Sequence, residues 1–319
     1  MELAPKSESR MSDRSIDDTL PLPPSGLAPG VPGRAADSAA TAVRIDVAGL
    51  SDKGKVREEN QDHFLVVRAG RYAETLATSL PAGAIPERSE DRGLVMVVAD
   101  GMGGQAAGEV ASRMVLVTLT HLILNHPEWA LKVNEKRAAD IQERVVARYQ
   151  ALDAALADRM QEDPALKGMG TTLTFAYSIG LDIFIAHAGD SRAYLFHEGS
   201  VRQLTRDDTY VQRLVEAGML SREAAAGHQL RNALTNVLGG GKRSVDVELE
   251  RLRIAPGDRL LLCSDGLTAT MKDEEIAGIL GGTGAAAESC RRLIDLALER
   301  GAPDNVTVIV ARYELSDNP

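Results

Sequence analysis

The sequence predicts an α+β layered sandwich, and the prediction rests on two patterns. Short apolar runs alternate as β-strands do, and connections such as "IGLD" and "EGS" are too short for a parallel crossover, so these strands are antiparallel. Segments with helical periodicity interrupt the strand runs in pairs. Antiparallel strands that alternate with helix pairs are typical of sheet and helix layers packed around a core.

The first half of the predicted domain contains three strands followed by two helices. The strands are expected in "AVRIDV", "HFLVV" and "GLVMVVA", and a polar insertion at about residues 71–92 joins the last two. One helix follows the glycines at 103–104. The second carries an apolar stripe, which we interpret as a core face. Its members are Ile141, Val145, Tyr149, Leu152, Leu156 and Met160.

The second half begins with four antiparallel strands, in "TTLTFAYS", "DIFIAHA", "RAYLFH" and "VRQLT". A polar helical segment follows, with Gly218 expected at a helix C-terminus and Ser221 at the next N-cap. In "VDVELERLRI" the apolar phase shifts between Leu249 and Leu252, which predicts a β-bulge. The strand "DRLLLCS", two helices and the strand "NVTVIVARY" complete the domain.

Composition limits both the domain organisation and the function. Residues 1–40 are rich in Pro, Gly, Ala and Ser and predict a disordered tail, so the folded domain is expected over 41–315. With 46 acidic and 36 basic side chains, a nucleic-acid partner is not expected. We recognise no membrane-spanning run and no signal peptide, and Cys263 and Cys290 read as core residues. These features predict a cytoplasmic protein.

Five aspartates lie where apolar strands begin or end. Asp100 follows "LVMVVA", Asp265 follows "LLLCS" and Asp190 follows "IAHAG", whereas Asp62 and Asp304 precede strands. A single aspartate at a strand end is usually a turn or cap residue. Five of them on the strands of one sheet system are expected to converge.

Converging carboxylates repel one another unless a cation balances their charge. All-oxygen ligands suit hard ions such as Mg²⁺ or Mn²⁺, and the Gly101 carbonyl can turn toward an ion because glycine has no Cβ. A pair of such ions about 3.5–4 Å apart supports displacement at phosphorus. Arg57, five residues before Asp62, carries a planar cation suited to phosphate. The pattern therefore favours metal-dependent phosphate hydrolysis.

Six motifs occur in the order found in metal-dependent protein phosphatases of the PP2C type, the PPM family. They are "GKVREENQDHF", "VVADGMGGQAAGEVAS", "MGTTLTFA", "AHAGDSRAYLF", "LLLCSDGL" and "DNVTVIVAR". The resemblance covers about residues 44–313, and the DGMGG and NQD forms resemble the bacterial branch. It implies an αββα sandwich of two antiparallel β-sheets flanked by helix pairs. It also implies a mobile helical flap at about residues 205–228 that influences substrate choice.

The resemblance implies roles for individual residues at a core metal pair. Asp100 resembles the acid that bridges two Mn²⁺ or Mg²⁺ ions, and the Gly101 carbonyl resembles a ligand of one of them. Asp265 and Asp304 resemble the remaining carboxylates of the pair. Asp62 matches the acid of the first motif, whose metal contact can run through water.

Two further roles follow from the same resemblance. Asp190 matches the acid of a third, weaker metal site, which Asp265 shares. Arg57 matches the arginine that binds the substrate phosphate.

Three positions depart from the family pattern. Met102 stands where animal members carry a histidine proposed as general acid, so the leaving-group proton is expected from water or elsewhere. Gln61 replaces a glutamate found in some relatives, and Asp208 replaces a flap histidine common in bacterial relatives. His63 and His187 flank acidic positions, and we interpret both as structural.

The implied activity is hydrolysis of phosphoserine and phosphothreonine in proteins by a metal-activated water, opposing a bacterial Ser/Thr kinase. The expected partners are phosphorylated proteins, with the kinase and its substrates among them, and the protein is expected to be a monomer. One alternative is a catalytically weak or regulatory binding module on a phosphatase fold, although no expected ligand is missing. Another is the branch acting on anti-anti-sigma regulators, which usually lacks the flap helices expected here in "YVQRLVEAGMLSREAA".

Overall fold

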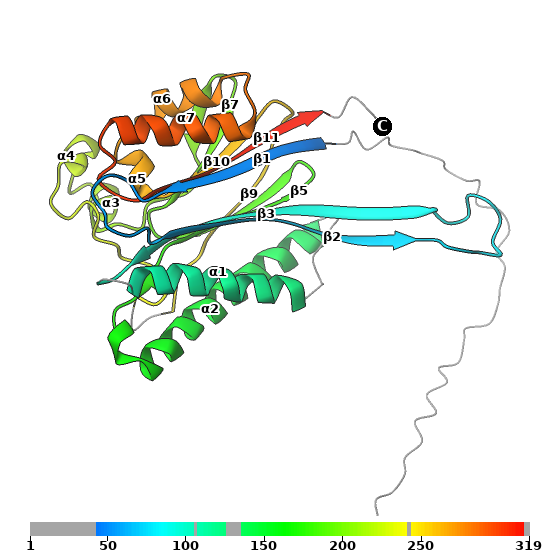
Figure 1. Ribbon diagram of the computed structural model, residues 1–319, viewed down its shortest axis with the longest axis horizontal. Coiled ribbons are helices and arrows are strands. Elements are labelled where there is room, and N and C mark those ends of the chain that lie inside the picture. Colours follow the sequence, from blue (N-terminus) through cyan, green and yellow to red (C-terminus); the bar gives the residue numbers. More distant parts are fainter. Residues whose placement is uncertain (1–42, 105–106, 126–134, 241–243, 316–319) are drawn as a thin grey trace, which may run out of the picture. The chain divides into compact units, whose positions relative to one another are not determined.

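The structure, a computed structural model, describes residues 43–104, 107–125, 135–240 and 244–315. The tail predicted over residues 1–40 lies outside these ranges. Within them the chain forms two antiparallel β-sheets that pack against each other, with helices on both outer sides (Figure 1). The predicted αββα sandwich is confirmed.

The first sheet brings the two ends of the folded domain together. Its strand order is β1-β11-β10-β7-β8. β1 pairs with β11 along its whole length, so Asp52 lies opposite Val306. The strands are β1 (Val43–Asp52), β7 (Arg192–His197), β8 (Ser200–Gln203), β10 (Arg259–Cys263) and β11 (Val306–Leu315).

The second sheet has the order β2-β3-β5-β6-β9, and the short strand β4 pairs with the end of β3. β5 and β6 are antiparallel neighbours in this sheet, and β7 and β8 in the first, as their short connections predicted. The strands are β2 (Asp62–Glu74), β3 (Arg88–Met102), β4 (Gly170–Thr171), β5 (Leu173–Ile179), β6 (Asp182–Ala188) and β9 (Glu248–Arg253).

Helices cover the outer face of each sheet (Figure 1). α1 (Ala107–Asn125) and α2 (Glu135–Glu162) lie on the second sheet, and α2 is followed by a 3₁₀ turn at Pro164–Leu166. α5 (Asp265–Thr268), α6 (Asp273–Leu280) and α7 (Ala286–Glu299) lie on the first. α3 (Tyr210–Glu216) and α4 (Arg222–Ala226) form the helical flap segment between β8 and β9.

Three apolar clusters hold these layers together. One lies between the second sheet and α1 and α2, one between the first sheet and α6 and α7, and one between the two sheets. The stripe predicted on α2 belongs to the first cluster, where five of its six members are buried and Met160 packs against them. Cys263 and Cys290 are both buried and unpaired by a disulfide, as expected.

The flap helices end and begin where the sequence predicted. Gly218 follows α3 in the left-handed conformation, with φ of +68°. Ser221 caps α4, because its side chain accepts a hydrogen bond from the Ala224 amide at 3.2 Å.

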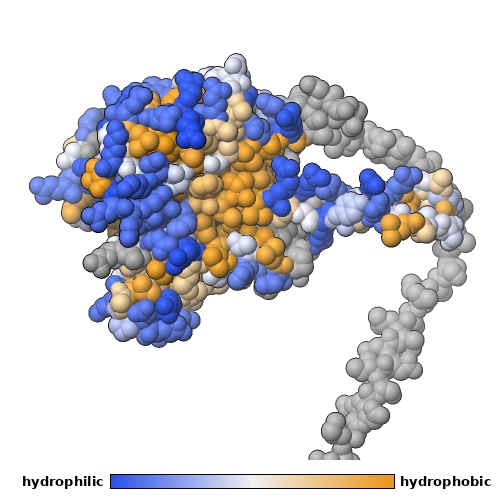
Figure 2. Space-filling model, viewed as in Figure 1, coloured by the Kyte–Doolittle hydropathy of each residue, from blue (hydrophilic) through white to orange (hydrophobic). Residues whose placement is uncertain are grey.

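The polar insertion expected at residues 71–92 begins and ends within a β-ribbon, because β2 and β3 extend into it from both sides. β2 and β3 remain paired until Glu74 lies opposite Arg88, and these two side chains form an ion pair at 2.9 Å. β5 accompanies β3 only from Leu94 onward, so the outer part of the ribbon has two strands. It extends away from the sandwich, and exposed apolar side chains, Leu76 among them, lie near its end (Figure 2).

The bulge predicted in "VDVELERLRI" is wrong. β9 pairs residue for residue with β6 from Glu248 to Arg253. The apolar phase changes because the strand contributes to two cores: Leu249 packs in the cluster beneath the helices, and Leu252 packs in the cluster between the sheets. A switch of buried face produced the pattern that a bulge would also produce.

The helix α1 corrects the expectation that no run has membrane-spanning length. Its 19 residues reach a mean hydropathy of 1.3, which is enough to cross a membrane by length and composition alone. Ala111, Val115 and Leu119 on this helix are buried against the second sheet. A core helix satisfies the same criteria, and this helix packs on the second sheet with its buried side.

Candidate metal and phosphate site

The structure brings the five predicted aspartates together. Asp62 and Asp100 lie directly opposite each other on β2 and β3. Burial raises the pKa of Asp100 well above its usual value, and repulsion from Asp62, Asp265, Asp190 and Asp304 raises it further. Residues up to 242 positions apart in the sequence therefore form one electrostatic group, from Asp62 to Asp304.

Contacts from two threonines hold the backbone at Asp100. The Asp100 amide donates to Thr172 Oγ1 at 3.0 Å, and its carbonyl accepts from the Thr172 amide and the Thr171 hydroxyl, both at 2.9 Å. A Cβ on Gly101 would lie 2.2 Å from the Gly108 carbonyl oxygen. Glycine is thus required for close packing at this position, and the role of its carbonyl as a metal ligand stays a prediction.

The second Asp-Gly pair is built in a similar way on the other sheet. Asp265 is the first residue of α5, which begins after a single residue, Ser264, at the end of β10. A Cβ on Gly266 would lie 2.0 Å from the Asn305 carbonyl oxygen, so the start of α5 packs closely on the start of β11. This contact places Asp265 beside Asp304. Burial is the largest cause that raises the pKa of Asp265, and the charge of Asp304 is the next.

Arg57 lies at the edge of the acidic group and is half-exposed. Its Nη2 contacts Asp304 Oδ2 at 2.7 Å, a pairing that the sequence did not indicate. Asn305 fixes the loop that carries Arg57, because its Nδ2 donates to the carbonyls of Lys53 and Glu59 at 2.8 and 2.9 Å. The Arg57 guanidinium is therefore next to the carboxylates and also accessible from solvent.

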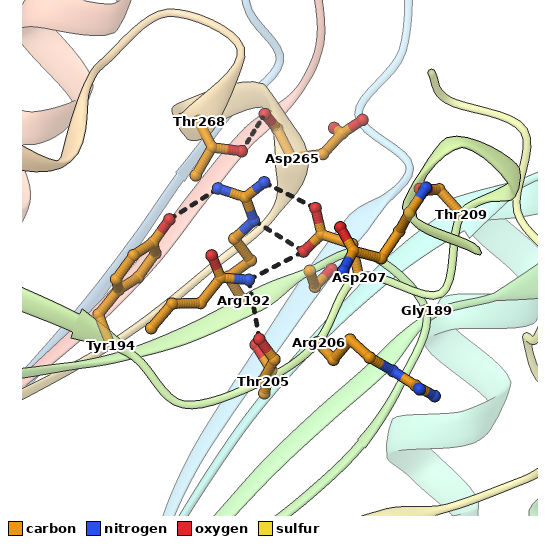
Figure 3. A network of polar contacts seen from close by, with 12 residues as sticks. Gly189, Arg192, Tyr194, Thr205, Arg206, Asp207, Thr209, Asp265 and Thr268 are labelled. Atoms are coloured by element: carbon orange, nitrogen blue, oxygen red, sulfur yellow. Dashed lines mark hydrogen bonds and ion pairs between the residues drawn. The ribbon is translucent and has the colours of Figure 1, made fainter. Parts of the chain in front are cut away.

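The Asp190 region is linked to the base of the flap by an arginine (Figure 3). Arg192, at the start of β7, donates from Nε and Nη2 to Asp207 at 2.8 and 2.6 Å and from Nη1 to the Tyr194 hydroxyl at 2.8 Å. Burial raises the pKa of Asp190, and the charges of Asp265 and Asp207 raise it further. Asp190 therefore belongs to the acidic group from the side of the flap.

Asp208, which replaces a flap histidine common in bacterial relatives, has a structural role. Its Oδ2 accepts hydrogen bonds from the Gly189 amide at 3.1 Å and from Asn236 Nδ2 at 2.7 Å. Its backbone carbonyl accepts from the Thr235 amide at 2.7 Å. Asp208 thus joins both ends of the flap to the turn that precedes Asp190.

The two histidines have local hydrogen-bond partners, in agreement with a structural role. His63 Nδ1 lies 3.0 Å from Ser112 Oγ. His187 is buried, with Nδ1 2.9 Å from Thr174 Oγ1 and Nε2 3.0 Å from the Gly189 carbonyl. Burial is the main cause that lowers the pKa of both imidazoles.

The chemistry of the acidic group fits a site for hard cations. Burial raises the pKa of Asp62 to about 6 and that of Asp265 to about 7. Asp62 Oδ1 is buried and has no hydrogen-bond partner among the described residues. Carboxylates that repel one another and leave a buried oxygen unpaired are stabilised by a bound cation. Oxygen-only donors favour Mg²⁺ or Mn²⁺ over softer metals.

The side chains are not arranged as a finished ligand shell. Among the residues that the structure describes, no three His, Cys, Asp or Glu side chains are positioned to hold an ion as they stand. Two contacts contribute to this arrangement: Asp304 is turned to Arg57, and one oxygen of Asp62 is bound to Ser264.

Sequence reasoning missed the residues that support these acids. Ser264, Asn305 and Thr172 each neighbour a motif residue, in "SDG", "DN" and "TT". The only feature of the sequence that could have indicated these three residues is their position inside the quoted motifs, next to other motif residues. Their partners lie far away along the chain, which hydropathy patterns do not reveal.

An αββα sandwich with gathered carboxylates and an adjacent arginine defines the class of metal-dependent phosphatase folds. Comparison with known proteins specifies the family. Residues 84–305 match the family described as protein phosphatase 2C, and the chain belongs to this family.

Named relatives agree with this assignment. The chain is 39% identical over 264 residues to the serine/threonine protein phosphatase PstP of Mycobacterium tuberculosis, covering 83% of this chain and 44% of that protein. It is 32% identical to the serine/threonine phosphatase stp of Listeria monocytogenes, covering 83% of this chain and 95% of the relative. The chain thus spans less than half the length of the mycobacterial relative.

A solved structure shows a similar fold with metal bound. The catalytic domain of PstP in complex with two manganese ions superposes with a TM-score of 0.65 at 35% identity. The alignment covers 85% of this chain and 99% of that domain. A relative that shares this fold therefore binds two manganese ions.

Proposed function

We propose that this chain is a metal-dependent protein serine/threonine phosphatase that hydrolyses phosphoserine and phosphothreonine. The observation that carries the proposal is the group of five aspartates gathered from both sheets, whose charges raise the pKa of Asp100. Such a group is costly without cations and becomes a strong site for them. Family membership and the names of the relatives support the same activity.

The acids divide into two sets in this proposal. Asp62, Asp100, Asp265 and Asp304, with the Gly101 carbonyl, hold two core ions, Mn²⁺ or Mg²⁺. When bound, the ions lower the pKa of a water molecule and neutralise the phosphate oxygens.

Asp190 forms a third and weaker metal site at the base of the flap, and Asp265 is a ligand of this site as well. Its position is supported by the electrostatic interaction of Asp190 with Asp265 and with Asp207.

Arg57 is the phosphate-binding residue in this proposal. Its side chain is 54% exposed and lies against Asp304, so it is close to the acids and accessible from solvent. A guanidinium can bind two phosphate oxygens at once. The hydrogen bonds from Asn305 to the Arg57 loop hold this loop next to the acidic group.

The leaving hydroxyl must receive a proton from water. Met102 is partly exposed next to the acidic group and has no proton to donate. His63 and His187 each have a lowered pKa and a local partner. We therefore assign no side-chain general acid.

The biological setting is part of the proposal. The substrates are phosphorylated proteins, including a bacterial Ser/Thr kinase and its targets, and the protein acts as a cytoplasmic monomer. The flap, held by Asp208 at the turn before Asp190, is the element that contacts the protein part of the substrate.

Hydrolysis of a phosphothreonine peptide tests the activity. We expect turnover with Mn²⁺, none with excess chelator, and loss of turnover in Asp100→Asn. Asp158→Asn, an exposed acid on α2, is the matched control and should keep full activity. Absence of metal-dependent turnover in the parent chain, with Mn²⁺ still bound, would favour a regulatory binding module instead.

A further inference from the structure

Ser264 is a fully buried residue between β10 and α5, next to the metal-site acids. Its Oγ lies 2.7 Å from Asp62 Oδ2 and accepts a hydrogen bond from the Thr307 amide at 2.9 Å. Because an ionised carboxylate can only accept hydrogen bonds, the serine proton is the one directed to Asp62. The contact connects residues 202 positions apart and joins the two sheets.

The contact makes the two carboxylate oxygens of Asp62 different from each other. Oδ2 is bound by Ser264, whereas Oδ1 is buried and has no hydrogen-bond partner in the part of the chain that the structure describes. The whole Asp62 residue is only 4% exposed, so Oδ1 lies away from bulk solvent. A buried carboxylate with one free oxygen opposite Asp100 is suited to face a cation.

Capping of α5 does not explain the serine. Ser264 occupies the N-cap position, but its side chain makes no capping hydrogen bond to the helix. Its hydroxyl is instead fully used between Asp62 and the Thr307 amide. The same threonine has its hydroxyl 2.7 Å from Ser51 Oγ, which extends the hydrogen-bonded chain into β1.

We propose that Ser264 is a positioning residue of the metal centre, which holds Asp62 by Oδ2 so that Oδ1 is directed toward the ions. The proposal rests on the metal-dependent function proposed above. Partners that hydrogen-bond a metal-binding carboxylate fix its orientation, and their loss typically weakens metal binding about 10- to 100-fold. Ser264 does not contact the phosphate and is not a catalytic residue.

Calorimetric titration of chelator-stripped protein with Mn²⁺ tests this role. We expect Ser264→Ala to bind Mn²⁺ about 10- to 100-fold more weakly than the parent chain. Ser178→Ala is the matched control, because Ser178 is also a buried serine that hydrogen-bonds locally, to the Gly180 carbonyl at 3.2 Å. This variant should lose thermal stability without losing Mn²⁺ affinity.

A second variant covers the case in which Ser264→Ala does not fold. Ser264→Cys keeps a side chain of similar shape and replaces the hydroxyl by a weaker S–H donor. We expect this variant to bind Mn²⁺ more weakly than the parent chain, with a similar melting temperature.

The outcomes separate this inference from the function on which it rests. Parent-like Mn²⁺ binding by Ser264→Ala, or by Ser264→Cys where the first variant is unfolded, overturns the positioning role and leaves the phosphatase proposal intact. Equal weakening in Ser178→Ala also overturns it, because general destabilisation would then explain the loss. Failure of the parent chain to bind Mn²⁺ overturns both.

Discussion

The two Asp-Gly turns show how one short motif serves two different backbones. At Asp100-Gly101 the chain continues as strand β3, and Thr171 in β4 and Thr172, the next residue, hold it by hydrogen bonds. At Asp265-Gly266 strand β10 has ended and the same dipeptide opens a helix. One turn belongs to each sheet.

What the turns share is close backbone packing behind the carboxylate. A Cβ would lie 2.2 Å from a carbonyl oxygen at the first glycine and 2.0 Å at the second. Each glycine therefore allows another segment to approach the acid: α1 in one case and the start of β11 in the other. In both cases the missing Cβ lets a second backbone segment lie against the acid, whatever secondary structure follows.

The largest expected effect comes from removing either acid. We expect Asp100→Asn and Asp265→Asn each to lower kcat/KM on a phosphothreonine peptide by more than about 100-fold, since loss of mere outer partners costs about 10- to 100-fold. Peptide hydrolysis under saturating Mn²⁺ measures this effect. Asp190→Ala is the contrast: it should weaken activity less and leave two ions detectable by calorimetry. A parent-like rate in either asparagine variant would remove that turn from the metal site.

Glycine replacement tests the shared packing. Gly101→Ala and Gly266→Ala should each lower the free energy of unfolding by about 1–3 kcal/mol or more, because the new Cβ meets backbone that cannot move aside. Urea denaturation measures the loss. Gly278→Ala provides the control, since this exposed helical glycine has open space around it and should gain about 0.5–1 kcal/mol. Equal behaviour of all three variants would contradict the packing argument.

The pH dependence of stability should differ between protein with and without metal. Folding raises the pKa of Asp62 to about 6 and of Asp265 to about 7, both from 3.8. The folded state therefore binds these protons more tightly, and their stabilising contribution is complete below pH about 4 and is lost as pH rises through 6 and 7.

Thermal melting of chelator-treated protein between pH 5 and 8 measures this dependence. We expect these acids to lower the free energy of unfolding over that range by roughly a few kcal/mol. Asp265→Asn should flatten the fall, and Mn²⁺ should oppose it, because metal binding favours the deprotonated acids. A curve in Asp265→Asn as steep as in the parent chain would contradict the assignment.

Much of the fold could be predicted because it is written in local periodicity. The α2 stripe and the flap caps Gly218 and Ser221 were all recognisable from spacing and residue type. The β2–β3 ribbon was missed because its strands carry charged residues, and pairing across the hairpin, such as Glu74 with Arg88, holds them together instead of burial. The phase shift in β9 was misread because alternation does not say how many cores a strand faces.

The sequence by itself determined the order of the motifs, the positions of the five aspartates at strand boundaries and the residue types that a hard-cation site needs. The tertiary structure decided which groups meet: Arg57 with Asp304, Asp207 with Arg192, and Ser264 with Asp62. The first and last of these pairs join residues more than 200 positions apart. Local patterns encode burial and backbone shape, whereas such contacts depend on how the two sheets align when they pack.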